Sequence, residues 1–109
     1  MLKSQIMLKA EAIVEALRPY YPQKVILFGS QARQEADEES DLDLILIKDT
    51  TARFLDRLRD VYMLLGDFGA IDVLVYKPQE VTQMLAEGNT FLEDALAEGI
   101  VLYEEKLDN

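Results

Sequence analysis

The sequence predicts one α/β domain in which a small mixed β-sheet of three to four strands is flanked by helices. Short apolar runs with strand character alternate along the chain with amphipathic segments of helical period. The 109 residues are close to the commonest size of one domain, and half of them are hydrophobic, which is enough for a buried core. We therefore expect residues 1–109 to form a single domain without a linker.

Apolar residues recur at helical spacing in four segments, each with a typical start or end signal. The predicted helices are residues 4–18 with Ser4 as cap, a helix capped by Thr50 or Thr51 and closed by Gly66, a helix from Pro78 to about Glu87, and a helix opened by the capping box Thr90–Glu93. We expect one or two further helical turns between Ser30 and Ala36.

Three apolar runs predict strands, at residues 25–28, 41–47 and 70–76, and residues 100–103 form either an edge strand or an extended tail. The run 41–47 alternates Asp-Leu-Asp-Leu-Ile-Leu-Ile, so Asp41 and Asp43 share one face of the strand. Both faces become apolar after Asp43. This pattern indicates a central strand that is covered on both sides and carries two carboxylates at its first end.

Composition excludes several kinds of site. The chain has no cysteine and no histidine, which rules out disulfides, thiolate nucleophiles, Ser-His-Asp catalysis and cysteine-based metal centres. Its net charge of −10 disfavours nucleic acid as a partner, because non-specific affinity comes from neutralising phosphates. Chemistry must therefore use carboxylates, hydroxyls, Lys, Arg and backbone amides.

No segment has the apolar core of a signal peptide or the roughly 20 apolar residues of a membrane span. We expect a cytoplasmic protein with no membrane contact.

Three features are unremarkable singly but informative together: Gly29-Ser30 after a strand, the pair Asp41-x-Asp43, and Asp72 at the start of a later strand. Asp is depleted in strands, yet here it stands at the mouths of the two most apolar ones. Carboxylates about 5 Å apart repel by roughly 3 kcal/mol at an effective dielectric near 20, which divalent cations would offset. Oxygen-only ligands favour Mg²⁺, and two such ions can clamp both oxygens of an in-line displacement.

Gly29 and Ser30 suit the phosphate end of a substrate. Glycine lets the backbone approach a phosphate, and amides that open a helix favour anions. Arg33 lies one turn further on and either reaches a phosphate, braces the acidic cluster, or is an ordinary surface residue.

The run Gly29-Ser30-Gln31-Ala32-Arg33, followed by Ser40-Asp41-Leu42-Asp43-Leu44, resembles the Gly-Ser, ten residues, Asp-x-Asp signature of the polymerase-beta-like nucleotidyltransferases. The similarity is strongest to their minimal, MNT-type branch and extends to the terminal Gly-x-x-Leu-Tyr at 99–103. Gln34, where family members often have Gly, departs from the pattern. The resemblance implies the nucleotidyltransferase fold.

By this resemblance, Asp41 and Asp43 bind two Mg²⁺ ions, Asp72 completes the nucleophile-side site and helps to deprotonate the acceptor, and Gly29 and Ser30 hold the triphosphate. The resemblance also implies an antitoxin that transfers AMP from ATP to a tyrosine of a HEPN-type toxin, in a possible hetero-oligomer. Two alternatives remain: a non-catalytic module that masks its partner, and nucleotidyl transfer to a small molecule or an RNA end.

Other side chains have two interpretations each. Arg53 and Arg57, with Lys48, either contact the nucleotide or an acidic partner, or lie on a solvated helix face. Tyrosines 20, 21 and 76 either stack on a base or fill gaps beside the sheet. Phe91 and Leu92 either dock a partner or pack in the core.

Overall fold

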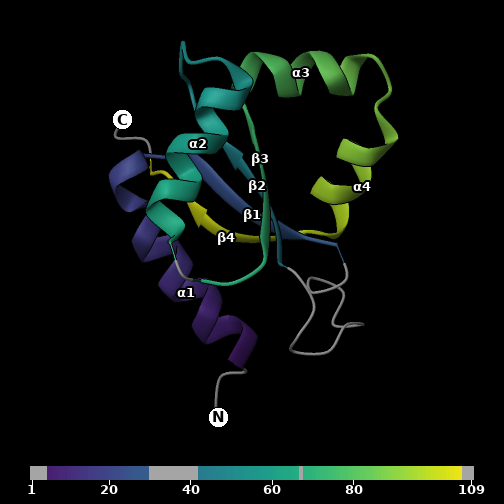
Figure 1. The fold of residues 1–109 in the computed structure, drawn as a ribbon. Helices are drawn as coiled ribbons and strands as arrows, with labels where there is room; N and C mark the ends of the chain where they lie inside the picture. The colour runs from purple at the N-terminus through teal and green to yellow at the C-terminus, as the bar shows by residue number, and fades with distance from the viewer. Residues whose placement is uncertain (1–4, 30–41, 67, 107–109) are drawn as a thin grey trace.

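A four-stranded sheet with the order β3-β2-β1-β4 forms the centre of the computed structural model, which describes residues 5–29, 42–66 and 68–106 (Figure 1). Strand β1 (Lys24–Phe28) pairs antiparallel with β2 (Leu42–Ile47) and with β4 (Ile100–Glu104). Strands β2 and β3 (Ile71–Tyr76) run parallel. The predicted mixed sheet is confirmed, and the segment 100–103 belongs to an edge strand.

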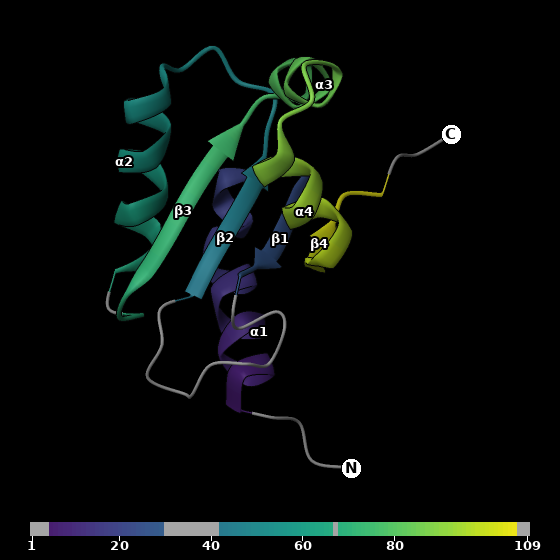
Figure 2. The ribbon, with the colours of Figure 1, turned by 90° about the vertical axis from the view of Figure 1, so that its right-hand side faces the viewer.

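Helices cover both faces of this sheet (Figures 1 and 2). Helix α1 (Gln5–Leu17), which continues into the 3-10 turn η1 (Arg18–Tyr20), and helix α2 (Phe54–Leu65) lie on one face. Helices α3 (Pro78–Ala86) and α4 (Thr90–Glu98) lie on the other. Within the described residues, no helix combines the length and the apolar character needed to cross a membrane.

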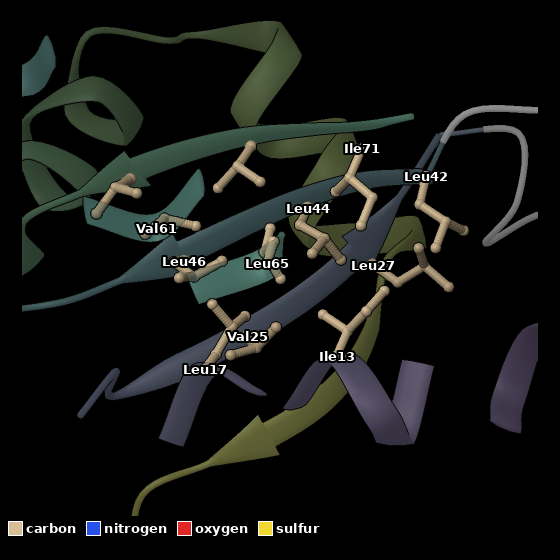
Figure 3. Packing of buried hydrophobic residues seen from close by; sticks show 12 residues of the cluster. Ile13, Leu17, Val25, Leu27, Leu42, Leu44, Leu46, Val61, Leu65 and Ile71 are labelled. Carbon is tan, nitrogen blue, oxygen red and sulfur yellow. The ribbon is translucent and has the colours of Figure 1, made fainter. Parts of the chain in front are cut away.

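Strand β2 has a core on each side because its side chains alternate between the two faces. Leu42, Leu44 and Leu46 join the larger cluster, to which α1 contributes Ile13 and Leu17 (Figure 3). Ile45 points the other way and joins Leu92 and Ala95 of α4. Leu44 and Ile45 are both fully buried, so the predicted central strand covered on both sides is confirmed.

The observed helix ends agree only in part with those predicted from the sequence. Pro78 is the first residue of α3, and Gly66 closes α2 with a φ of 51°, as predicted. The predicted cap of α2 is wrong, because the helix begins at Phe54 and the Thr50 hydroxyl instead accepts a hydrogen bond from the Ala52 amide at 3.1 Å.

The predicted start of α4 is displaced by one residue. Asn89 is the cap, and its side-chain oxygen accepts a hydrogen bond from the Leu92 amide at 2.9 Å. Thr90 is the first helical residue. Asn and Thr are both good caps, and only the backbone geometry distinguishes them.

Arg57 is a structural side chain, which corrects its assignment to a solvated helix face or a nucleotide contact. It is 5% exposed and donates to the carbonyls of Ala52 at 2.8 Å and Val75 at 3.1 Å. It also pairs with Glu80 at 2.8 Å, and Glu80 accepts the Lys77 amide at 2.7 Å. This pair ties α2 and the end of β3 to the first turn of α3.

Gly99 lets the end of α4 approach the sheet closely. A Cβ at this position would lie 2.4 Å from the carbonyl oxygen of Ala95 and 2.7 Å from Cγ2 of Ile26. Its φ of −71° suits any residue, so space and not backbone conformation demands glycine here.

We predict that Gly99→Ala lowers the free energy of unfolding by about 1–3 kcal/mol, because the added methyl would clash with the Ala95 carbonyl in the last turn of α4 and with Ile26 of β1. Gly88→Asn is the control: Gly88 has a φ of 76° and open space around it, and Asn tolerates this conformation at less than about 1 kcal/mol. Chemical denaturation measures both. Equal losses in the two variants would contradict the packing argument.

We also predict that Glu80→Gln destabilises the protein by about 1–2 kcal/mol at neutral pH, since it leaves buried Arg57 without its counter-charge while Glu80 itself is partly exposed. Burial works to raise the pKa of Glu80, but the Lys77 amide and Arg57 outweigh it and hold this pKa below its ordinary value of 4.5. A lowered folded pKa means that the stabilisation is present above about pH 4.5 and disappears as the pH falls further.

The measurement is the unfolding free energy of wild type and Glu80→Gln from pH 7 to pH 3. The two curves should converge below pH 4.5, and exposed Glu105→Gln should follow wild type throughout. A Glu80→Gln deficit that persists unchanged at pH 3 would show that the carboxylate's charge is not the cause.

Candidate functional site

Three strand ends meet at one end of the sheet. Phe28, the last residue of β1, pairs with Asp43 near the start of β2. Asp43 is in turn the register partner of Asp72 near the start of β3. Neighbouring strands lie about 4.8 Å apart, so the sheet places these two aspartates side by side.

Both carboxylates lie on the face that α3 and α4 cover. Asp43 shares its face of β2 with Ile45, and Asp72 shares its face of β3 with Leu74. Ile45 and Leu74 both belong to the cluster around α4. Asp43 is half-buried and Asp72 is exposed, so the pair stands where the covered sheet opens to solvent.

Gly29 directly follows β1 and lies against Asp43. Its φ is 77°, a conformation that other residues rarely adopt. A Cβ at Gly29 would lie 2.6 Å from Oδ2 of Asp43. Both the backbone turn and the carboxylate therefore require glycine at this position.

The other predicted site residues lie outside the described part of the chain. Ser30, Arg33 and Asp41 belong to this group, as does the short helix expected between Ser30 and Ala36. Among the residues that are described, no group of three or more acidic side chains could hold a metal ion. The described donors are the oxygens of Asp43 and Asp72, which is the ligand chemistry that Mg²⁺ prefers.

A cavity of about 250 Å³ adjoins Gly29 between the end of β1 and α4. Its lining consists of Phe28, Gly29, Phe91, Asp94, Ala95 and Glu98. Asp94 and Glu98 are not among the site residues predicted from the sequence. The signal was present, because positions 91, 94, 95 and 98 share one face of a helix.

The tyrosines fill gaps or face solvent away from this site. Tyr20 packs against the core that α1 and α2 share, and its ring lies under the ammonium group of Lys48 at 4.5 Å. Tyr76 lies at the far end of β3, 6.3 Å from the ring of Phe54. Burial raises the pKa of Tyr20 and of Tyr76. The side chain of Tyr21 is 80% exposed and faces solvent.

Of the two candidate docking residues, Leu92 is fully buried in the core. Phe91 is 45% exposed and packs edge to face on Phe28, with ring centroids 5.5 Å apart.

Comparison with known proteins supports this fold. The family model described as polymerase beta, nucleotidyltransferase matches residues 11–108. Comparison with curated protein sequences found no match. Among solved structures, a putative nucleotidyltransferase from Sulfolobus solfataricus superimposes with a TM-score of 0.68 at 20% identity, covering 93% of this chain and 82% of that one.

Two further solved structures are toxin–antitoxin complexes. One is a toxin–antitoxin crystallised with AMP-PNP, with a TM-score of 0.62, 19% identity and coverage of 89% of this chain and 74% of the other. The second contains a tri-AMPylated Shewanella oneidensis HEPN toxin with an MNT antitoxin, with a TM-score of 0.57, 19% identity and coverage of 90% and 71%. At this level of identity the likeness concerns the fold, which is the expected nucleotidyltransferase fold.

We predict that Gly29→Ala displaces the Asp43 carboxylate and weakens divalent-ion binding, besides lowering stability by about 1–2 kcal/mol through its positive φ. Gly66→Ala is a matched control, because Gly66 also has a positive φ but no atom lies within 4 Å of its Cβ position. Paramagnetic broadening of the Asp43 and Asp72 NMR signals by Mn²⁺ measures binding. Equal broadening in the two variants would show that Gly29 does not position Asp43.

Proposed function

This chain belongs to the polymerase beta nucleotidyltransferase family, and from that premise we propose that it transfers AMP from ATP to a hydroxyl group of a HEPN-type partner protein in the cytoplasm. The observation that carries the proposal is the in-register pair of Asp43 and Asp72 beside Gly29. Carboxylates at the starts of two apolar strands are better explained by phosphoryl-transfer chemistry than by a contribution to folding stability.

Asp43 and Asp72, together with Asp41 two residues before Asp43, would hold the magnesium ions in this proposal. The described donor set fits this role, because it consists of carboxylate oxygens on one face of the sheet at the edge of solvent. Bound Mg²⁺ supplies charge neutralisation at the phosphates and orients the attacking and leaving oxygens.

In the proposed reaction, the acceptor hydroxyl oxygen forms a bond to the α-phosphorus of ATP, and the bond from that phosphorus to the oxygen bridging to the β-phosphate breaks. Pyrophosphate leaves with the bonding electron pair. Asp72, on the exposed outer strand, takes the proton of the hydroxyl group and passes it to solvent. Gly29, Ser30 and Arg33 hold the triphosphate on the β1 side.

The order of the strands supports this division of roles. Gly29 follows β1 and Asp72 lies on β3, with Asp43 on β2 between them. A triphosphate at Gly29 and an acceptor at Asp72 would therefore approach the central carboxylate from opposite sides, as an in-line displacement requires.

A protein acceptor is proposed on two grounds. The similar structure of an AMPylated HEPN toxin with its MNT antitoxin gives a precedent for AMP on a protein partner. We therefore propose that a tyrosine of the partner is the acceptor and that this chain acts as an antitoxin. The net charge of −10 disfavours an RNA end. A lasting complex with the partner, a hetero-oligomer, agrees with this role.

We predict that Asp43→Asn and Asp72→Asn each reduce AMP transfer by roughly 10²–10⁴-fold, because each removes a negative charge that the reaction uses. Neither variant should lower the unfolding temperature, since each relieves repulsion between in-register carboxylates. Asp60→Asn, at an exposed position of α2, is the control and should retain activity.

The assay uses radiolabelled ATP and a co-expressed HEPN-type protein, with mass spectrometry for added AMP. If the chain is a catalyst, one wild-type molecule should inactivate many partner molecules. The Asp43→Asn and Asp72→Asn variants should inactivate none. Undiminished silencing by Asp43→Asn, at one molecule per partner and without added AMP, would replace the proposal by stoichiometric masking.

A further inference from the structure

We propose that Tyr21 is itself an acceptor of AMP, which a second copy of this chain transfers to it. This inference rests on the proposed function, because it is the same reaction with a tyrosine of this chain in place of the partner's. The phenolic oxygen of Tyr21 forms a bond to the α-phosphorus of ATP, and pyrophosphate leaves with the bonding electron pair. Asp72 of the second copy takes the phenolic proton and passes it to solvent. The product is a phosphodiester that joins Tyr21 to AMP.

Tyr21 has the most exposed side chain of the five tyrosines in this chain. It is 80% exposed, whereas Tyr62 is 43% exposed. The hydroxyl of Tyr62 also accepts a hydrogen bond from the Val73 amide at 3.0 Å. The remaining three are partly buried: Tyr20, Tyr76 and Tyr103. Because an enzyme can modify only a hydroxyl group that enters its active site, Tyr21 is the tyrosine best placed to be an acceptor.

The backbone of Tyr21 is strained. Its φ of 57° and ψ of 51° are left-handed, and among the described residues it is the only non-glycine residue with a positive φ. This conformation is unfavourable for a residue with a Cβ atom, and glycine or asparagine adopts it more easily. The exposed ring recovers little of this cost through burial. Stability therefore does not explain a tyrosine here, and strained residues of this kind are concentrated at functional sites.

The turn that carries Tyr21 is held from several sides. The Tyr21 amide donates to the Arg18 carbonyl at 2.9 Å and closes η1. The ammonium group of Lys48 donates to the carbonyls of Tyr20 and Tyr21, the latter at 3.5 Å. Pro22, the next residue, is buried and has a fixed φ. An acceptor presented on such an ordered turn loses little conformational freedom when a second molecule binds it.

A cavity beside the Tyr21 ring has room for the transferred group. Its volume is about 450 Å³, within the range of roughly 300–1,000 Å³ typical of small-molecule sites. Arg18 is its charged residue, and no carboxylate is among the described residues that line it. Arg18 pairs with Glu15 at 2.8 Å, but both side chains are exposed, so the pair contributes little and the guanidinium can contact the phosphodiester instead. The cavity lining is Val14, Arg18, Pro19, Tyr21, Pro22 and Tyr103.

Tyr21 cannot reach the carboxylate pair of its own chain. It precedes β1, whereas Asp43 pairs with Phe28, the last residue of this five-residue strand. A strand of this length spans roughly 16 Å. The cavity beside Tyr21 also lies on the face of the sheet that α1 covers, and Asp43 lies on the face that α3 and α4 cover. The transfer must therefore take place between two molecules.

The first test incubates the purified chain alone with radiolabelled ATP and Mg²⁺ and locates added AMP by mass spectrometry. Wild type should gain one AMP group on Tyr21, at an initial rate that rises with the square of the protein concentration. Tyr21→Phe keeps the ring and removes the hydroxyl, so it should abolish the labelling. Tyr62→Phe is the matched control at the other exposed tyrosine and should be labelled like wild type.

The second test mixes two variants that differ in mass. Asp43→Asn retains the acceptor but lacks a carboxylate of the proposed active site, and Tyr21→Phe retains the active site but lacks the acceptor. Neither variant should be labelled alone. In the mixture, AMP should appear on the Asp43→Asn chain only. AMP on the Tyr21→Phe chain would overturn the inference, because the acceptor would then be another residue.

A HEPN-type partner protein in a parallel reaction separates this inference from the proposed function. If wild type adds AMP to the partner but not to itself, Tyr21 is not an acceptor and the proposed function stands. If wild type labels neither protein, the proposed function fails, and the inference fails with it. A first-order rate of self-labelling would also overturn the inference, since transfer would then occur within one molecule.

Discussion

The register of β2 between β1 and β3 is the constraint on which the rest of this molecule depends. Because β-strand side chains alternate, a slip of one residue would move Asp43 into the core under α1 and α2 and bring Leu44 to the other face. Burying the charged carboxylate of Asp43 in that apolar core makes such a slip very unfavourable. The same register that completes the two cores therefore also fixes Asp43 beside Asp72 and Gly29.

The charged side chains at the two ends of the sheet differ in how far they are buried. At the far end of β3, the guanidinium of Arg57 is buried and paired, with Glu80 and two backbone carbonyls as partners. At the near end, Asp43 is half-buried and Asp72 is exposed, so solvent screens the pair. The first arrangement holds α2, β3 and α3 together, and the second leaves two carboxylates accessible to a ligand. A structural charge and a candidate functional charge are thus distinguished by burial, not by residue type.

Helix α4 owes its place over β1 to two residues at its ends. Asn89 starts the helix through its hydrogen bond to the Leu92 amide, and Gly99 allows the last turn to lie against β1 without a side chain between them. Leu92 and Ala95 then bury against Ile26 and Ile45, which leaves Phe91, Asp94 and Glu98 around the cavity beside Gly29. The packing of α4 against the sheet therefore also determines which of its residues line the cavity.

The sequence by itself determined the alternation of strands and helices, the two-sided burial of residues 42–47 and the motif that indicates the family, because these follow from local period and spacing. It placed the cap of α2 at Thr50 or Thr51 and that of α4 at Thr90, since several good caps lie close together and only backbone geometry selects one. The site roles of Gly29, Ser30, Arg33, Asp41, Asp43 and Asp72 remain predictions. Tertiary structure alone decided that Asp43 and Asp72 are register partners on adjacent parallel strands, that Arg57 is buried, and that α4 forms a cavity at Gly29. Each of these joins residues distant in the chain, and no local pattern specifies which distant segments pack together.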